Sequence, residues 1–201
     1  MRGFARIAVV ISSILLAACA THIKPSTMSN PPPTEKFSAF DRFELKPIVL
    51  SAAYADHDAN QKATAKIQAY FDERVRPVVN QWNNGKGDKN DAGATTLLIE
   101  PRIEHIKFIG IGARIWVGPL AGSSAVVMKV RYVDKHTGKI IAEPEFYQRA
   151  AAMSGAFTFG GQDNAMLARI STLVADYNTR NYAQRVGGES GATPDTEIAS
   201  N

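Results

Sequence analysis

The chain has 201 residues, and its 23 basic and 19 acidic side chains give a formal net charge of +4. Two of the basic residues, both arginines, lie within the first 18 positions, so the chain that remains after removal of this segment is nearly neutral, and we predict no nucleic-acid partner. The single cysteine, Cys19, excludes a disulfide within the chain, so the fold must be stabilised by a hydrophobic core.

Residues 1–18 have the order of charge and hydrophobicity of a secretory signal peptide. Two arginines precede an apolar stretch over residues 7–16, which is too short to span a bilayer as a stable helix. The four residues that end at Cys19, Leu-Ala-Ala-Cys, resemble the lipobox of bacterial lipoproteins, in which small residues precede an obligatory cysteine. We therefore predict cleavage between Ala18 and Cys19, covalent diacylglycerol and N-acyl lipid on Cys19, and no other cofactor.

The residue after the predicted lipid attachment site indicates which membrane holds the protein. It is Ala20, whereas an aspartate there tends to retain lipoproteins in the inner membrane of enteric-type bacteria. We expect attachment to the outer membrane, facing the periplasm, with the inner membrane as the alternative. Several acyl chains on one cysteine would hold the protein far more firmly than a single chain could.

Both ends of the mature chain have the composition of segments outside a folded domain. Residues 19–36 are polar and proline-rich, which predicts an extended tether that holds the domain away from the bilayer. Residues 186–201 are rich in glycine, serine, threonine and acids, which predicts a disordered tail. The folded part is then one domain over residues 37–185, a usual domain size.

The first half of this domain predicts a strand followed by a broken helix. Residues 40–50 alternate in hydrophobicity as a strand does, and Pro47 places that strand at a sheet edge. Residues 56–82 then have apolar side chains every three or four positions, as one face of a helix does. Pro77 predicts that the helix kinks or that its regular part ends near residue 76.

Three further strands are predicted over residues 95–109, 125–134 and 139–151, and a tight turn at residues 134–139 joins the last two. Each strand alternates apolar with charged side chains, as a strand with one solvated face does. The solvated faces carry acids, bases and acids in turn, so opposite charges would face each other in an antiparallel meander. We interpret this surface as a solvated sheet face, with a binding surface as the alternative.

The same alternation assigns individual side chains to the two faces. Ile140 and Phe146 are predicted to point inward, and Glu145 outward. His105 continues the inward register of Ile103, so we expect a hydrogen-bonded residue at the end of the core rather than a catalytic base.

A last helix is predicted over residues 163–182, with Asp163 as its N-cap. The element order is therefore strand, helix, three strands and helix. We predict an α+β fold of two layers, in which two helices cover one face of a mostly antiparallel sheet of about four strands.

The sequence predicts no catalytic residues and no metal site, and we expect that the protein is not an enzyme. The run Asp56-His57-Asp58 has ligand-type side chains, but neighbours at a helix start do not readily converge on one ion, and a capping role is favoured. The glycine-rich residues 157–164 lead into a helix as a phosphate loop does, but they lack the lysine that would neutralise a phosphate.

The segment over residues 109–122 is long and apolar where a short polar turn would join two strands. One interpretation is that it folds back over the end of the core. The other is that it docks another protein, packs in a homo-oligomer or dips into lipid. The candidate interaction residues are Ile111, Arg114, Ile115, Trp116 and Leu120.

Several glycine-and-strand motifs resemble one known group of proteins. Residues 99–103, 120–128, 137–142 and 159–161 are similar to the bacterial lipoproteins of domain-of-unknown-function family 4410. The resemblance covers about residues 37–182, implies a fold and a cellular address, and carries no catalytic residues.

The leading hypothesis from the sequence is a membrane-anchored periplasmic lipoprotein that acts as a non-enzymatic accessory or assembly factor of the cell envelope. Its partners would be the membrane, through the lipid, and an envelope protein or further copies of the chain. The alternative is a periplasmic lipoprotein that binds a small ligand or a lipid between its sheet and its helices.

Overall fold

The computed structural model describes residues 23–87, 93–108, 124–150 and 161–194. The first half contains β1 (Ser29–Asn30), η1 (Phe37–Ala39), β2 (Arg42–Leu45), β3 (Val49–Leu50), η2 (Ala52–Tyr54), α1 (Asp58–Arg74) and α2 (Arg76–Lys86). The second half contains β4 (Thr96–Lys107), β5 (Ala125–Asp134), β6 (Ile140–Ala142), β7 (Glu145–Arg149), α4 (Gly161–Ala183) and β8 (Gly188–Glu189).

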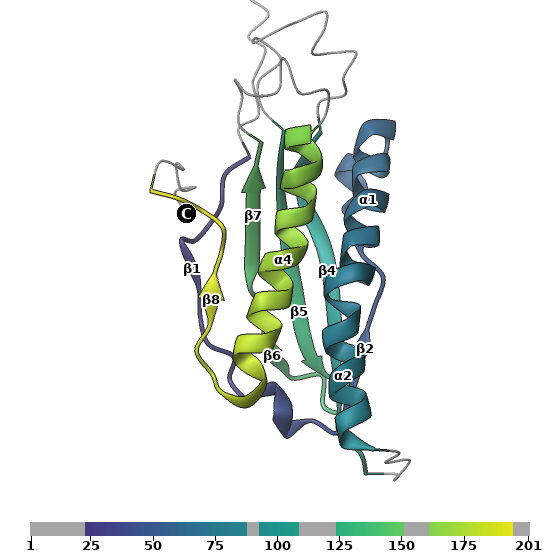
Figure 1. The fold of residues 1–201 in the computed structure, drawn as a ribbon, viewed down its shortest axis with the longest axis vertical. Coiled ribbons are helices and arrows are strands. Elements are labelled where there is room, and N and C mark those ends of the chain that lie inside the picture. Colours follow the sequence, from purple (N-terminus) through teal and green to yellow (C-terminus); the bar gives the residue numbers. More distant parts are fainter. Residues whose placement is uncertain (1–22, 88–92, 109–123, 151–160, 195–201) are drawn as a thin grey trace, which may run out of the picture.

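The main sheet has two long central strands, β4 and β5, and an interrupted strand on each side. Its order is β2-β4-β5-β6, with β3 also pairing with β4 and β7 also pairing with β5. The pairs of β5 with β4, β6 and β7 are antiparallel. The helices α1, α2 and α4 lie on one face of the sheet (Figure 1). The predicted α+β fold, with two layers and a mostly antiparallel sheet, is therefore confirmed.

The edge formed by β2 and β3 runs parallel to β4. This direction follows from the connection, because α1 and α2 together carry the chain back to the end of the sheet from which β2 started. The interruption between β2 and β3 contains Pro47, which has no N–H for a strand ladder. The predicted edge position of this strand is confirmed.

The helices bury the faces that their sequence periodicity predicts. In α1, Ala63, Ile67 and Phe71 recur every four residues and are almost fully buried. Pro77 lies in the first turn of α2, where a missing N–H costs nothing, and α1 ends three residues before it. The predicted break is confirmed. In contrast, α4 begins at Gly161, so Asp163 lies inside this helix and is not its N-cap.

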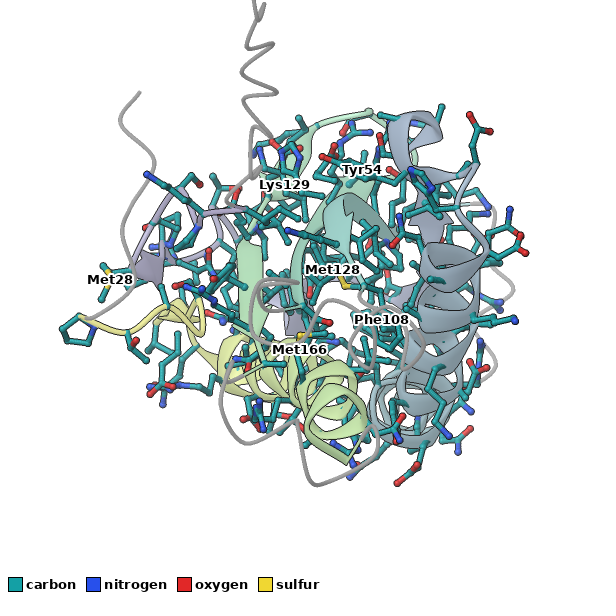
Figure 2. All side chains as sticks on the ribbon, turned by 90° about the horizontal axis from the view of Figure 1, so that it is seen from above. Met28, Tyr54, Phe108, Met128, Lys129 and Met166 are labelled. Atoms are coloured by element: carbon teal, nitrogen blue, oxygen red, sulfur yellow. The ribbon has the colours of Figure 1, made fainter. Side chains whose placement is uncertain are left out.

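Aromatic side chains fill the space between the sheet and the helices. Phe37, which η1 inserts at one end, stacks on Tyr132 of β5 with 4.6 Å between ring centroids. Its ring is also 6.1 Å from that of Trp82 and 6.2 Å from that of Tyr177. Figure 2 shows Met128 and Met166 in the same interior, whereas Lys129 points to the opposite side of the sheet.

Residues 23–36 form an N-terminal strap that lies along the β6–β7 edge of the sheet. The Thr34 N–H donates to the Ile141 carbonyl at 2.8 Å. The carboxamide of Asn30 accepts the Glu145 N–H and donates to the Glu145 carbonyl, both at 2.8 Å. This strap corrects the predicted boundary at residue 36, because an edge strand leaves backbone groups that need partners and the strap supplies them.

The chain after α4 also packs on the domain. β8 pairs with β1 of the strap, and the Ser190 carbonyl accepts the Tyr147 N–H of β7 at 2.7 Å. The Asn181 side chain accepts the Val186 and Gly187 N–H groups, each at 2.9 Å, which turns the chain after the helix. Residues 186–194 therefore belong to the folded domain rather than to the predicted tail.

Candidate interaction surface

We call the face of the sheet opposite the helices the open face. It carries charged side chains along β2, β4 and β5 and at the connection between β6 and β7. Its register follows from the pairing, in which Glu100 of β4 lies opposite Arg131 of β5, and Arg102 lies opposite Lys129. The charged residues of the open face include Glu44, Glu100, Arg102, Lys129, Arg131 and Glu143.

Ion pairs link the strands across this face. Arg131 lies between two acids, with its guanidinium 3.3 Å from the Glu100 carboxylate and 3.7 Å from that of Glu143. Glu44 of β2 pairs with Lys46, and with Lys135 of the β5–β6 hairpin at 2.9 Å. The predicted opposition of acids and bases is confirmed for Glu100 and Arg131, whereas Arg102 lies opposite a second base, Lys129, and pairs with Glu104 of its own strand at 3.3 Å instead. Exposed pairs of this kind contribute only a few tenths of a kcal/mol each, so they shape the surface more than they stabilise the fold.

Two carboxylates at the hairpin end of the sheet are held in their charged form. Hydrogen bonds from Lys46 and Lys135 lower the pKa of Glu44. The pKa of Asp134 is also lowered, chiefly because the Thr137 hydroxyl donates to its carboxylate at 2.7 Å. The backbone N–H of His136 donates to the same side chain at 2.9 Å. The two bonds to Asp134 close the tight turn that the sequence predicts over residues 134–139.

A polar recess borders the open face beside β2. It has a volume of about 760 Å³, and its walls include Asp41, Arg42, Glu44, Asn83 and Lys135. The Asn83 carboxamide accepts the Phe43 N–H and donates to the Phe43 carbonyl, both at 2.9 Å, so it closes the outer edge of β2. The recess thus holds charged side chains of both signs, and one of its wall residues, Asn83, already bonds to the backbone of β2.

His105 does not point into the core as predicted. A β-bulge between Ile103 and His105 shifts the register of β4, so Ile106 is buried and His105 is exposed. Its Nδ1 lies 2.8 Å from the Tyr54 hydroxyl, which confirms the expected hydrogen bond.

Two further assignments in the third predicted strand are wrong. Ile140 is 45% exposed and Ile141 is buried, because the register between β5 and β6 shifts here: Ile140 lies opposite Val133 and Ala142 opposite Tyr132, so Ile141 has no residue directly opposite it. Glu145 is buried rather than solvated, because the strap covers it and the Ser26 N–H donates to its carboxylate at 2.6 Å. Phe146 is buried as predicted.

The acid-histidine-acid run lies at the start of α1. His57 is the N-cap residue, and no side-chain capping hydrogen bond forms there, so that part of the prediction is wrong. Asp58 lies in the first turn, where its negative charge interacts favourably with the helix dipole. Within the ranges that the structure describes, no group of three His, Cys, Asp or Glu side chains could hold a metal ion.

The predicted lipid and interaction residues lie outside the described residues. These are Ala18 and Cys19, the candidate loop residues Ile111, Arg114, Ile115, Trp116 and Leu120, and the glycine-rich stretch up to residue 160. None of the described helices has the length and hydrophobicity needed to cross a bilayer.

Comparison with known proteins gives only remote likenesses. No protein-family model and no curated protein sequence matches the chain. Among solved structures, the PelC dodecamer from Paraburkholderia phytofirmans is similar at 10% identity and a TM-score of 0.37, covering 71% of this chain and 91% of PelC. A candidate lipoprotein from Caulobacter crescentus is similar at 13% identity and a TM-score of 0.30, covering 68% and 91%.

A Xanthomonas campestris protein of domain-of-unknown-function family 330 is similar at 9% identity and a TM-score of 0.36, covering 81% of this chain and 90% of that protein. We infer neither family nor function nor assembly from likenesses of this size. The resemblance to family 4410, which rests on short sequence motifs, therefore stays a prediction.

Proposed function

We propose that this protein is a lipid-anchored lipoprotein of the outer membrane, facing the periplasm, which acts as a non-enzymatic accessory or assembly factor through protein contacts. The observation that carries this proposal is the open face, where charged side chains of both signs lie along β2, β4 and β5 and at the β6–β7 connection, and Arg131 links Glu100 to Glu143 across the strands. An arrangement of this kind favours recognition of a complementary charged surface, because charges set the specificity and orientation of docking more than its affinity.

The lipid anchor is supported by the sequence pattern around Cys19. The apolar segment with Trp116 is the second proposed contact. Its two ends, Phe108 and Ser124, follow β4 and precede β5, so it joins the sheet at the end opposite the β5–β6 hairpin. The proposal therefore offers a partner one charged surface and one apolar segment of the chain.

Photocrosslinking in cells that express the chain tests this proposal. A photoreactive residue is placed at Trp116, at Arg131 on the open face, or at Ala65, which is exposed on the helix layer and serves as the control. We expect a specific protein adduct from Trp116 or Arg131 and none from Ala65. Equal labelling at all three positions, or no adduct from any of them, would contradict a contact-based role.

The alternative, a small ligand or lipid held between sheet and helices, has less support. The part of that interior lined by Phe37, Tyr132 and Tyr177 is already filled by their packed rings. Native mass spectrometry of the purified protein checks this alternative, because a bound lipid would copurify and add a discrete mass.

A further inference from the structure

The start of the N-terminal strap is fixed on the open face of the sheet. Ile23 packs against a small apolar cluster of Ala125, Val127 and Tyr147, all three of which are buried. Val127 lies opposite Tyr147 of β7 and next to Met128, whose side chain faces the helices, so this cluster faces away from the helix layer. The strap therefore begins at one end of the sheet, beside the start of β5.

This position limits how far the domain can move from a lipid on Cys19. Cys19 precedes Ile23 by four positions, and four residues span at most about 14 Å. A free tether over residues 19–36 would reach several times farther. Because the strap lies against the sheet from Ile23 onward, the end of the sheet that holds Ala125 must stay close to the bilayer surface.

The same end carries basic side chains on the open face. Lys107 of β4, Ala125 of β5 and Arg149 of β7 lie directly opposite one another in one row. Lys24 follows Ile23 in the strap. Of the acids near this end, Asp56 and Asp58 lie at the start of α1 in the helix layer (Figure 1), and Glu104 of β4 pairs with Arg102 at 3.3 Å.

We infer that this end of the domain faces the bilayer and that Lys24, Lys107 and Arg149 contact anionic phospholipid headgroups. The inference rests on the proposed lipid anchor at Cys19. The lipid attaches the protein to the membrane, and the short link between Cys19 and Ile23 keeps this end of the sheet towards the bilayer. The basic row then supplies the attraction, because juxtamembrane lysines and arginines are drawn to anionic lipid. The β5–β6 hairpin points into the aqueous space at the other end of β5, about 30 Å away.

Lysine labelling of the lipidated protein in vesicles tests this orientation. The full-length gene product is purified from membranes, the mass of its N-terminal peptide is measured, and it is reconstituted in phosphatidylcholine vesicles with or without phosphatidylglycerol. A water-soluble amine-acylating reagent is then applied, and labelling is read by mass spectrometry. We expect phosphatidylglycerol to lower labelling of Lys24 and Lys107 by about fivefold. Labelling of Lys135 and Lys139, which are more than half exposed on the hairpin, should not change.

Charge variants separate headgroup contact from simple tethering. Lys107→Glu with Arg149→Glu should abolish the effect of phosphatidylglycerol on Lys24, whereas the matched hairpin pair Lys135→Glu with Lys139→Glu should preserve it. Lipidated protein with equal labelling of both ends in both vesicles would overturn the orientation and leave the proposed function intact. A missing lipid on Cys19 would overturn both. Protection of Lys24 and Lys107 in cells but not in protein-free vesicles would assign this end to a protein partner and overturn the lipid contact.

Discussion

The carboxamide of Asn30 replaces a strand neighbour for Glu145. It accepts the Glu145 N–H and donates to the Glu145 carbonyl, both at 2.8 Å, although 115 positions separate the two residues. On the opposite edge of the sheet, the carboxamide of Asn83 makes the same pair of bonds with Phe43. Both edges are thus closed by a side chain where a further strand could otherwise add, which guards the sheet against edge-to-edge association.

Asn30→Ala should loosen the strap. The substitution leaves the Glu145 N–H and carbonyl buried without their partner, which costs about 1–3 kcal/mol of unfolding free energy. Urea unfolding measures that loss, and trypsin should cleave faster after Lys24 and Lys36. The exposed Asn84→Ala is the control and should change neither quantity. An unchanged cleavage rate in Asn30→Ala would show that the strap does not depend on this pair.

Gly187→Ala should destabilise the protein. Gly187 has a φ of 71°, and a Cβ there would lie 2.3 Å from the backbone oxygen of Asn30. Since neither group can move without separating β8 from the strap, we expect a loss of more than about 1 kcal/mol in thermal or urea unfolding. Gly85→Ala in α2 is the matched control, because a Cβ there meets no other atom. It should stabilise the helix by about 0.5–1 kcal/mol, and a loss equal to that of Gly187→Ala would argue against the steric account.

The buried bond between Tyr132 and Asn178 predicts a non-additive double substitution. The Tyr132 hydroxyl donates to the Asn178 carboxamide at 2.5 Å, and in the described part of the chain the Asn178 Nδ2 has no partner. Tyr132→Phe alone should lower the free energy of unfolding by about 1–3 kcal/mol, because it removes the hydroxyl that bonds to the buried Asn178 carboxamide.

Tyr132→Phe combined with Asn178→Leu should recover much of that loss, because both buried polar groups are then removed together. Urea unfolding of the two single variants and of the double variant gives the coupling free energy. Strictly additive losses would show that the two groups do not depend on each other.

Glu44 should make stability depend on pH in the acid range. Its pKa in the folded protein is lowered by Lys46 and Lys135, so its contribution is present above the pKa of the unfolded chain, near 4.5, and is lost as the pH falls through the folded value. Lys135→Ala should raise the pKa of Glu44 towards 4.5, which a carboxyl-detected NMR titration measures. Lys139→Ala is the control, because Lys139 pairs with Glu35 at 2.7 Å instead. A Glu44 titration that both variants leave unchanged would contradict the assigned cause.

Local sequence patterns were sufficient to predict the two layers of this protein. The period of the apolar residues in α1, the alternation in β4 and β5, and the break before Pro77 are local properties that each segment carries with it. Because these elements can bury their apolar faces in few ways, their order was sufficient to predict two helices on one face of a mostly antiparallel sheet.

The two ends of the domain and the edges of its sheet depend instead on contacts between distant segments. Residues 23–36 and 186–194 are polar and contain prolines or glycines, so their composition matches a tether and a tail. In the fold, however, both segments hydrogen-bond to the backbone of β7, and β1 pairs with β8. Glu145 is buried for the same reason, and the bulge in β4 turns His105 outward. These outcomes depend on hydrogen bonds between residues far apart in the chain, which local periodicity does not encode.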